Sequence, residues 1–253
     1  MPELKTITVE LVFSYLIILC RIGSALMVLP GISESYIAAR SRLILALSIT
    51  LVILPNIVTP KIPTNIVNLG FLIIIEIIIG IFLGSITKFL ISAMHVLGML
   101  IATISGLGSA LLFDPTQGTQ GALVGTFLSN LSIMLFFATD MHHMLIYGFA
   151  DSYSLFELGQ TIDIGEISQE MTSVFNKSFN IAIRLAAPQI IVAVIIVLAG
   201  GVLGRLMPAL QIFNLIAPVQ MIISFIILMF TISTFMLWYI DNVYEINQNY
   251  FIP

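Results

Sequence analysis

Long apolar stretches alternate with short polar breaks along the chain, which is the pattern of helices that cross a membrane. The breaks are rich in proline, glycine or charged side chains, the residues that end helices. Several of the apolar stretches approach the ~20 residues that a helix needs to cross the hydrocarbon core of a bilayer. The predicted helical segments are residues 9–29, 43–58, 67–87, 89–112, 122–149, 172–206 and 219–244.

This pattern predicts an all-α protein. In lipid, every backbone polar group must find a partner within its own segment, and helices meet that demand. The alternation of apolar and polar positions that a membrane β-barrel needs is absent. We therefore expect a polytopic membrane protein of about six to eight helical segments. Residues 1–253 are expected to form a single membrane-embedded domain.

The charge distribution predicts that some segments do not cross the membrane simply. Arg40 and Arg42 favour a cytoplasmic position for the first loop. No Lys or Arg lies between Lys88 and Lys177, whereas residues 140–170 carry six acidic side chains, as an extracytoplasmic loop would. Full crossings by every segment cannot satisfy both signals. Several segments are therefore expected to form bent or re-entrant hairpins, which need protein or water around their irregular backbone.

Composition supports a membrane location and removes several function classes. The chain is 59% hydrophobic and 9% charged, whereas a soluble domain carries about 25% charged residues. Its polar surface is too small to cover a soluble monomer. The net charge of −4, with no basic patch, gives nucleic-acid binding no support. Cys20 is the only cysteine, so an internal disulfide is impossible.

Small residues recur at helical spacing and predict close contacts between helices. Spacing by four places them along one helical face, where membrane helices approach closely. Two further pairs, Gly80 with Gly84 and Gly121 with Gly125, repeat the spacing in neighbouring segments. The longest such run consists of Gly98, Ala102, Gly106 and Ala110.

Three charged residues stand within otherwise apolar segments and are expected to be buried: Arg21, Glu76 and Arg184. An ionisable group at that depth is a functional candidate, and Glu76 could relay protons or bind a cation. The alternative, which we favour, is a neutral or paired Glu76 that holds helices together. The arginines could pair with acids, extend to the interface or face a water-filled lumen, and we expect pairing or contact with a neighbouring subunit.

The sequence predicts neither an enzyme nor a cofactor or metal site. It contains no phosphate-binding loop, no G-x-S-x-G elbow and no H-E-x-x-H zinc motif. His142 and His143 follow Asp140, but adjacent residues point in different directions on a helix, which makes a poor metal site. His95 stands alone.

The most polar interruption between apolar segments is LLFDPTQGTQG at residues 111–121. Aspartate favours a turn and proline removes a backbone donor, so the Asp-Pro pair is expected to end the preceding helix. The glycines permit positive φ and add no side-chain bulk. The loop residues of interest are Leu111, Leu112, Phe113, Asp114, Pro115, Gln117, Gly118 and Gly121.

Two interpretations of this loop remain open. From the residues alone, an ordinary turn between two spans is the simpler one. If the loop faces a channel, the apolar Leu111, Leu112 and Phe113 can form a constriction that holds back water and ions by dewetting. The glycines would let such a constriction move aside.

Four stretches, in order, resemble the FliR family of flagellar export proteins, which is related to the SctT subunits of injectisomes. One departure is Asp140-Met141, where the family has Asn-Gly, and it leaves any capping role of that pair open. The motifs look closer to the flagellar branch. The stretches are RIGSALMVLP (21–30) with RSRLILALS (40–48), SALLFDPTQGTQ (109–120), HHMLIYGFADSY (142–153) and VLGRLMPALQIFNLIAP (202–218).

The resemblance implies a structural, channel-forming subunit of the export gate in the bacterial inner membrane, at the flagellar basal body. It implies assembly with FliP-like and FliQ-like subunits, with an FlhB-like subunit as a further partner, and passage of unfolded flagellar proteins. It also implies that the central loop projects into the lumen and helps to close it. The alternative is a self-contained secondary transporter that uses Glu76 and a broken helix as its site.

Overall fold

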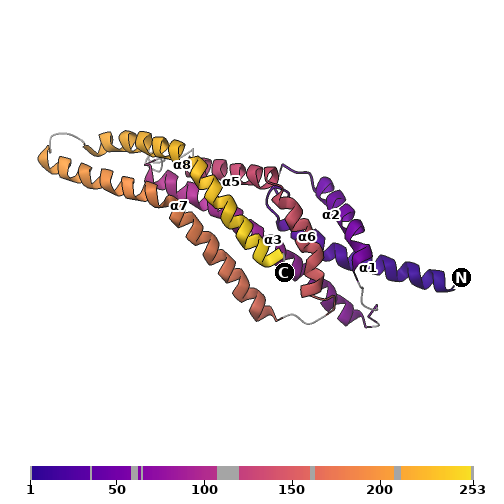
Figure 1. The fold of residues 1–253 in the computed structure, drawn as a ribbon. Helices are drawn as coiled ribbons and strands as arrows, with labels where there is room; N and C mark the ends of the chain where they lie inside the picture. The colour runs from indigo at the N-terminus through magenta and orange to yellow at the C-terminus, as the bar shows by residue number, and fades with distance from the viewer. Residues whose placement is uncertain are drawn as a thin grey trace. The chain divides into compact units, whose positions relative to one another are not determined.

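The computed structural model describes residues 2–34, 36–57, 62–63, 65–106, 120–159, 163–207 and 212–251. Within these ranges the regular secondary structure is helical (Figure 1), which confirms the all-α prediction. One 3₁₀ turn, η1 (Leu54–Asn56), follows the second helix. The α-helices are α1 (Pro2–Val28), α2 (Ala39–Ile53), α3 (Ile66–Ile104), α5 (Gln120–Ala138), α6 (Met141–Leu155), α7 (Ile164–Leu206) and α8 (Ile212–Phe251).

The prediction of separate helices at 67–87 and 89–112 is wrong, because α3 continues through both segments as one helix of 39 residues. Lys88 between them is a good helix former and lies exposed, so it does not interrupt the helix. The helix ends at Ile104, before the expected residue 112. Gly106 follows with φ +78°, the left-handed conformation in which glycine commonly terminates helices.

The predicted segment 122–149 is instead two helices, α5 and α6, separated by a break at Thr139 and Asp140. Asp140 adopts φ 59°, and it is the one non-glycine residue with positive φ among the described residues. A left-handed residue cannot continue a right-handed helix. The two helices together form a bent pair long and apolar enough for one broken span, as expected for a chain with bent segments.

Among the described residues, five helices are individually long and apolar enough to cross a membrane, and the bent α5–α6 pair raises the number to as many as six. The longest are α3, α7 and α8, with 39, 43 and 40 residues. At about 1.5 Å per residue, each has a contour length of roughly 60 Å. This is about twice the thickness of the hydrocarbon core, so these helices extend beyond a simple perpendicular span.

The chain divides into two compact units. The first unit contains Met1–Phe89, Phe137–Phe175 and Tyr244–Pro253, and the second contains Leu90–Phe136 and Asn176–Val243. Each unit has its own buried apolar residues. In the first these include Ile18, Ile22, Ile79, Leu145 and Phe149, and in the second they include Leu97, Leu128, Ala182, Ala186 and Leu228.

Candidate functional site

The centre of the first unit is a buried ion pair between Arg21 of α1 and Glu76 of α3. The exposed fractions of the two side chains are 1% and 0%. Arg21 Nε donates to Glu76 Oε2 at 2.6 Å, and Arg21 Nη2 donates to Glu76 Oε1 at 3.1 Å. This two-pronged arrangement is the strongest geometry available to an arginine and a carboxylate.

The remaining Arg21 donors are satisfied by the C-terminal end of α6. Arg21 Nη1 donates to the Ser152 carbonyl and to Ser152 Oγ, each at 3.2 Å. Arg21 Nη2 also donates to the Phe156 carbonyl at 2.9 Å. The guanidinium carbon lies 3.9 Å from the ring centroid of Tyr153, which adds a cation–π contact. Five hydrogen bonds thus match the five N–H donors of a guanidinium.

This cluster connects three helices at one point. Removing charged groups from water is costly, and only complete pairing with good geometry offsets the cost. The side chains of Arg21 and Glu76, predicted separately as buried charges, are therefore each other's partners. The hydrogen bonds to Ser152 and Phe156 extend the contact to α6. We call the Arg21–Glu76 pair with its hydrogen bonds to α6 the charged clamp. Its role is structural, because both side chains are fully paired and neither is left free for proton transfer.

Arg184 differs from the other two charges. The prediction that it is buried is wrong, because its side chain is exposed on α7. The neighbours Ala182, Leu185 and Ala186 are buried. Since successive helix residues turn by about 100°, these three occupy the inner face and Arg184 points away from it.

Two glycines of α3 allow the close approach that brings Arg21 to Glu76. A Cβ added to Gly80 would collide with the Arg21 carbonyl and with Ser24 Oγ of α1. A Cβ on Gly84 would meet the carbonyl of Ala25, which also belongs to α1. The predicted spacing of small residues at Gly80 and Gly84 therefore coincides with a tight contact between two helix backbones.

In the second unit, a close approach at glycines likewise joins α3 and α5, the two helices that flank the central loop. A Cβ on Gly98 of α3 would collide with the backbone of Gly125 of α5, and a Cβ on Gly125 would meet the His95 carbonyl at 2.9 Å. Ala102, one turn further along α3, is fully buried. The helix before the loop and the helix after it are thus packed backbone to backbone.

The end of α3 is held by α8. The side-chain amide of Gln220 donates to the carbonyl of Ile104, the last residue of α3. Carbonyls at a helix C-terminus lack a partner within the helix, so this bond satisfies one of them. The left-handed Gly106, two residues later, lies against Ala217 of α8. Gly106 and the helical residues Gly98 and Ala102 are therefore not on one continuous helix face.

The predicted loop lies largely outside the described residues. Gly121 falls in the first turn of α5, and the other candidates lie outside the described residues. These are Leu111, Leu112, Phe113, Asp114, Pro115, Gln117 and Gly118, together with Ala110 of the small-residue run.

A buried pair that sequence reasoning missed joins α7 and α8. Ser224 Oγ donates to Gln189 Oε1 at 2.9 Å, and Gln189 Nε2 donates to the Ser224 carbonyl at 3.2 Å. Both side chains are buried. The available signal was a glutamine directly after Pro188 in an apolar helix, since a polar residue in such a segment needs a partner.

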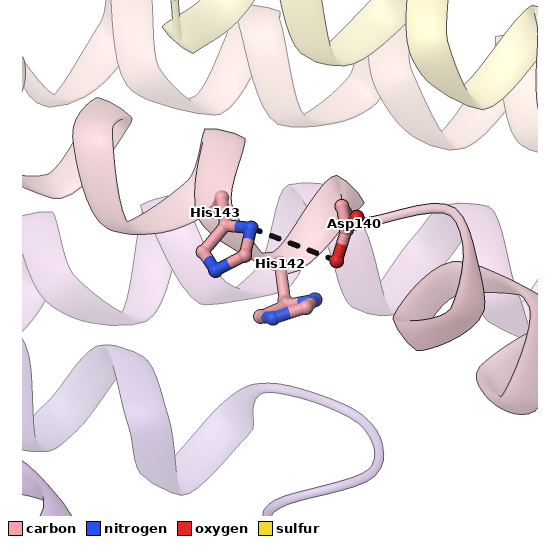
Figure 2. A group of neighbouring side chains, drawn as sticks. All are labelled: Asp140, His142 and His143. Atoms are coloured by element: carbon pink, nitrogen blue, oxygen red, sulfur yellow. Dashed lines mark ion pairs between the residues drawn. The ribbon is translucent and has the colours of Figure 1, made fainter.

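Asp140, His142 and His143 gather at the start of α6 (Figure 2). One ligand atom from each residue lies within 4.8 Å of the others. The sequence rule that neighbouring helix residues diverge assumes a regular helix, and Asp140 is outside it with φ 59°. The residues that we predicted to be a poor metal site are thus brought together.

The chain is similar to known bacterial export proteins. The profile described as "Bacterial export proteins, family 1" matches residues 12–246. The flagellar biosynthetic protein FliR of Caulobacter vibrioides is 31% identical over 233 residues, which cover 91% of this chain and 92% of that protein. FliR of Bacillus subtilis is 25% identical over 231 residues, with 89% and 88% covered.

The similarity extends to secretion systems. The Yop proteins translocation protein T of Yersinia pestis is 24% identical over 221 residues, which cover 85% of this chain and 84% of that protein. The profile match spans nearly the whole chain, and it includes the Arg21–Glu76 clamp and both helices that flank the central loop. The chain therefore belongs to the FliR family of bacterial export proteins.

Proposed function

We propose that this membrane component of the type III export apparatus is a structural, channel-forming subunit of the flagellar export gate. It resides in the bacterial inner membrane at the flagellar basal body. It assembles with FliP-like and FliQ-like subunits, and with an FlhB-like subunit as a further partner. Unfolded flagellar proteins pass through the resulting channel, and residues 111–121 help to close it.

The observation that carries this proposal is the way the chain holds the two ends of the central loop. On one side, Gln220 caps the end of α3 at Ile104. On the other, Gly125 of α5 packs against Gly98 of α3. The chain therefore leaves α3 and enters α5 at defined points of the fold, and a closing element needs such a fixed base.

The exposed apolar surface supports a role within an assembly in the membrane. Large hydrophobic side chains such as Leu198 of α7 and Met229 and Phe230 of α8 are exposed on the isolated chain. Extended apolar surface of this kind requires cover by lipid or by other subunits. The ~60 Å contour lengths of α3, α7 and α8 exceed what lipid alone covers, which favours partner subunits along part of each helix.

A secondary transporter based on Glu76 has little structural support. That function needs an accessible ionisable group at an interruption in a helix. Glu76 is completely buried in its pair with Arg21, and α3 continues through it without a break. Purification distinguishes the two functions: a stable complex with two other small membrane proteins supports the gate. A monomer or homodimer that moves a small solute would contradict it.

The gate itself is tested by Phe113→Ala and by deletion of residues 114–120. Both changes are expected to increase ion leak across the membrane, because the apolar constriction is lost. The matched control is Phe127→Ala, which removes an exposed phenylalanine from the body of α5 and should leave the leak at the wild-type level. Unchanged leak together with unchanged export of flagellar proteins in both loop variants would rule out the gate.

A further inference from the structure

We propose that Asp140, His142 and His143 bind a divalent transition-metal ion of the zinc type at the start of α6. Their three ligand atoms lie within 4.8 Å of one another. Figure 2 shows the aspartate just before the first turn of the helix, with both imidazoles beside it. The proposal concerns residues of the first unit alone and does not depend on the gate.

The backbone at Asp140 turns the carboxylate toward the histidines. Aspartate before a helix usually accepts a hydrogen bond from the first-turn N–H groups. Asp140 makes no such bond. Its left-handed conformation, φ 59° and ψ 16°, instead leaves Oδ1 at 3.7 Å from Nδ1 of His143. The carboxylate is therefore available as a ligand, and it offsets the partial positive charge at the helix N-terminus.

His142 supplies the second line of support. Its ring packs against Phe137, with centroids 5.4 Å apart, and against His143, with centroids 4.1 Å apart. The Nδ1 atom of His142 is buried and has no hydrogen-bond partner. A buried polar atom without a partner costs free energy, because it has lost its water and gained nothing in return. A metal ion bound by this nitrogen removes that cost.

The chemistry of the set fits a borderline transition metal. Two imidazole nitrogens and one carboxylate oxygen are ligands that Zn²⁺ accepts, with water completing a tetrahedral shell. At bond lengths of about 2.0–2.2 Å the ligand atoms would draw together to roughly 3.4 Å. The side chains of Asp140 and His143 are 76% and 61% exposed, so both can rotate to close the site.

The local charge also favours a cation. The sequence has no Lys or Arg between Lys88 and Lys177, and the same interval is rich in carboxylates. No Lys or Arg close to Asp140 in the sequence therefore competes with a metal ion for its carboxylate. Binding would tie Asp140 to the first turn of α6 and make its left-handed backbone rigid.

The test uses the full-length protein in detergent, purified through a tag without histidine and stripped of metal by a chelator. Co²⁺ is titrated and followed by its visible absorption, and Zn²⁺ is measured by competition with a chromophoric chelator. We expect one bound ion per chain. His142→Ala and Asp140→Asn should each weaken binding by about tenfold or more, the loss seen even for residues that only support metal ligands.

The control is His95→Ala, which removes the one histidine outside the cluster and should bind the metal as the wild type does. Asp140→Asn keeps the test decisive if His142→Ala fails to fold, since Asp140 is exposed and its replacement has the same shape. The site is refuted if the wild type binds neither ion. It is also refuted if Asp140→Asn binds as tightly as the wild type, or if His95→Ala weakens binding as much as the cluster variants.

Discussion

The two compact units solve the same packing problem with different chemistry. The first unit joins its helices through a charged clamp, Arg21 with Glu76, which five hydrogen bonds complete. The second joins its helices through neutral contacts: a glycine-to-glycine crossing and the Gln189–Ser224 pair. In each unit these polar side chains are buried among apolar residues. The two units therefore differ in the free-energy cost of removing one partner of a contact.

A buried charge without its partner keeps the full cost of leaving water, whereas a neutral amide or hydroxyl keeps a smaller one. The charged clamp therefore defines one arrangement of α1, α3 and α6 and makes every other arrangement costly. The neutral contacts of the second unit impose a weaker penalty. This comparison predicts that a substitution in the charged clamp of the first unit destabilises the protein more strongly than a substitution in the neutral contacts of the second.

The largest effect is expected for Glu76→Leu. The substitution leaves the Arg21 guanidinium buried with three of its five acceptors and no counter-charge. Breaking a buried ion pair in this way costs about 3–5 kcal/mol. We expect a corresponding loss in the free energy of unfolding, measured in bicelles or mixed micelles, and a sharp fall in the amount of protein inserted in cells.

Two further variants separate the charge from the side-chain volume. Glu245→Leu removes an exposed glutamate of the first unit and should change stability little. The double variant Arg21→Met with Glu76→Leu removes both charges and should recover much of the loss, because no unpaired charge remains. A stability of Glu76→Leu within experimental error of the wild type would show that the clamp does not stabilise the first unit.

Gly98→Ala should have the next largest effect. The added methyl group would collide with the backbone of Gly125 and force α3 and α5 apart. Overpacking of this kind costs about 1–3 kcal/mol, which unfolding in bicelles can measure. Gly201→Ala is the matched control in the same unit, because nothing lies within 4 Å of its added Cβ. Equal stability of the two variants would contradict a tight helix crossing at Gly98.

The sequence predicted the helical class and the close contacts at Gly80, Gly84, Gly98 and Gly125 because both follow from local spacing, but it wrongly placed Gly106 on the same helical face as Gly98. It did not predict which charges pair, since Arg21 and Glu76 are separated by 55 positions and meet only through the tertiary fold. The apolar surroundings of Arg184 resemble those of Arg21 in sequence, yet Arg21 lies against Glu76 of α3, whereas Arg184 is exposed on α7. Burial of a charge in this chain is thus decided by the neighbouring helix.

Helix boundaries were predicted less well, for a related reason. A single lysine at position 88 looked like an interruption, but one exposed charge costs a helix almost nothing. The break at Asp140 gave only a weak local signal, because aspartate visits the left-handed region more often than most residues, yet most aspartates do not adopt it. The left-handed backbone at Asp140 also turns its carboxylate toward the two histidines. Because the sequence did not reveal that backbone, Asp140, His142 and His143 were predicted to be a poor metal site.

A smaller loss is expected when the neutral pair of the second unit is broken. Ser224→Ala removes the donor to Gln189 Oε1 and leaves the glutamine with one hydrogen bond, to the Ser224 carbonyl. Side-chain hydrogen bonds between membrane helices contribute about 0.6 kcal/mol on average, so we expect a loss near that value. A double-mutant cycle with Gln189→Leu measures the coupling. A loss as large as that of Glu76→Leu would remove the contrast between the two units.

Gln220→Leu should have the smallest effect on overall stability and the most local one. It removes the side-chain donor to the Ile104 carbonyl, and because this bond is only partly buried, its loss should cost less than the average of about 0.6 kcal/mol for such bonds between membrane helices. The last turn of α3 is expected to fray, which hydrogen exchange at residues 101–106 would detect as faster exchange. Gln248→Leu, at an exposed amide that donates to Tyr244, is the control and should leave that exchange unchanged.

The same variant connects packing to the proposed gate. If residues 111–121 close a channel from a fixed base, a frayed end of α3 should raise ion leak while the protein remains folded and inserted. Faster exchange with wild-type leak would mean that closure does not depend on the base of the loop. Unchanged exchange would show that Gln220 does not hold the end of α3. The losses in stability, largest for Glu76 and smallest for Gln220, then distinguish the contacts that stabilise the fold from the contact that positions the central loop.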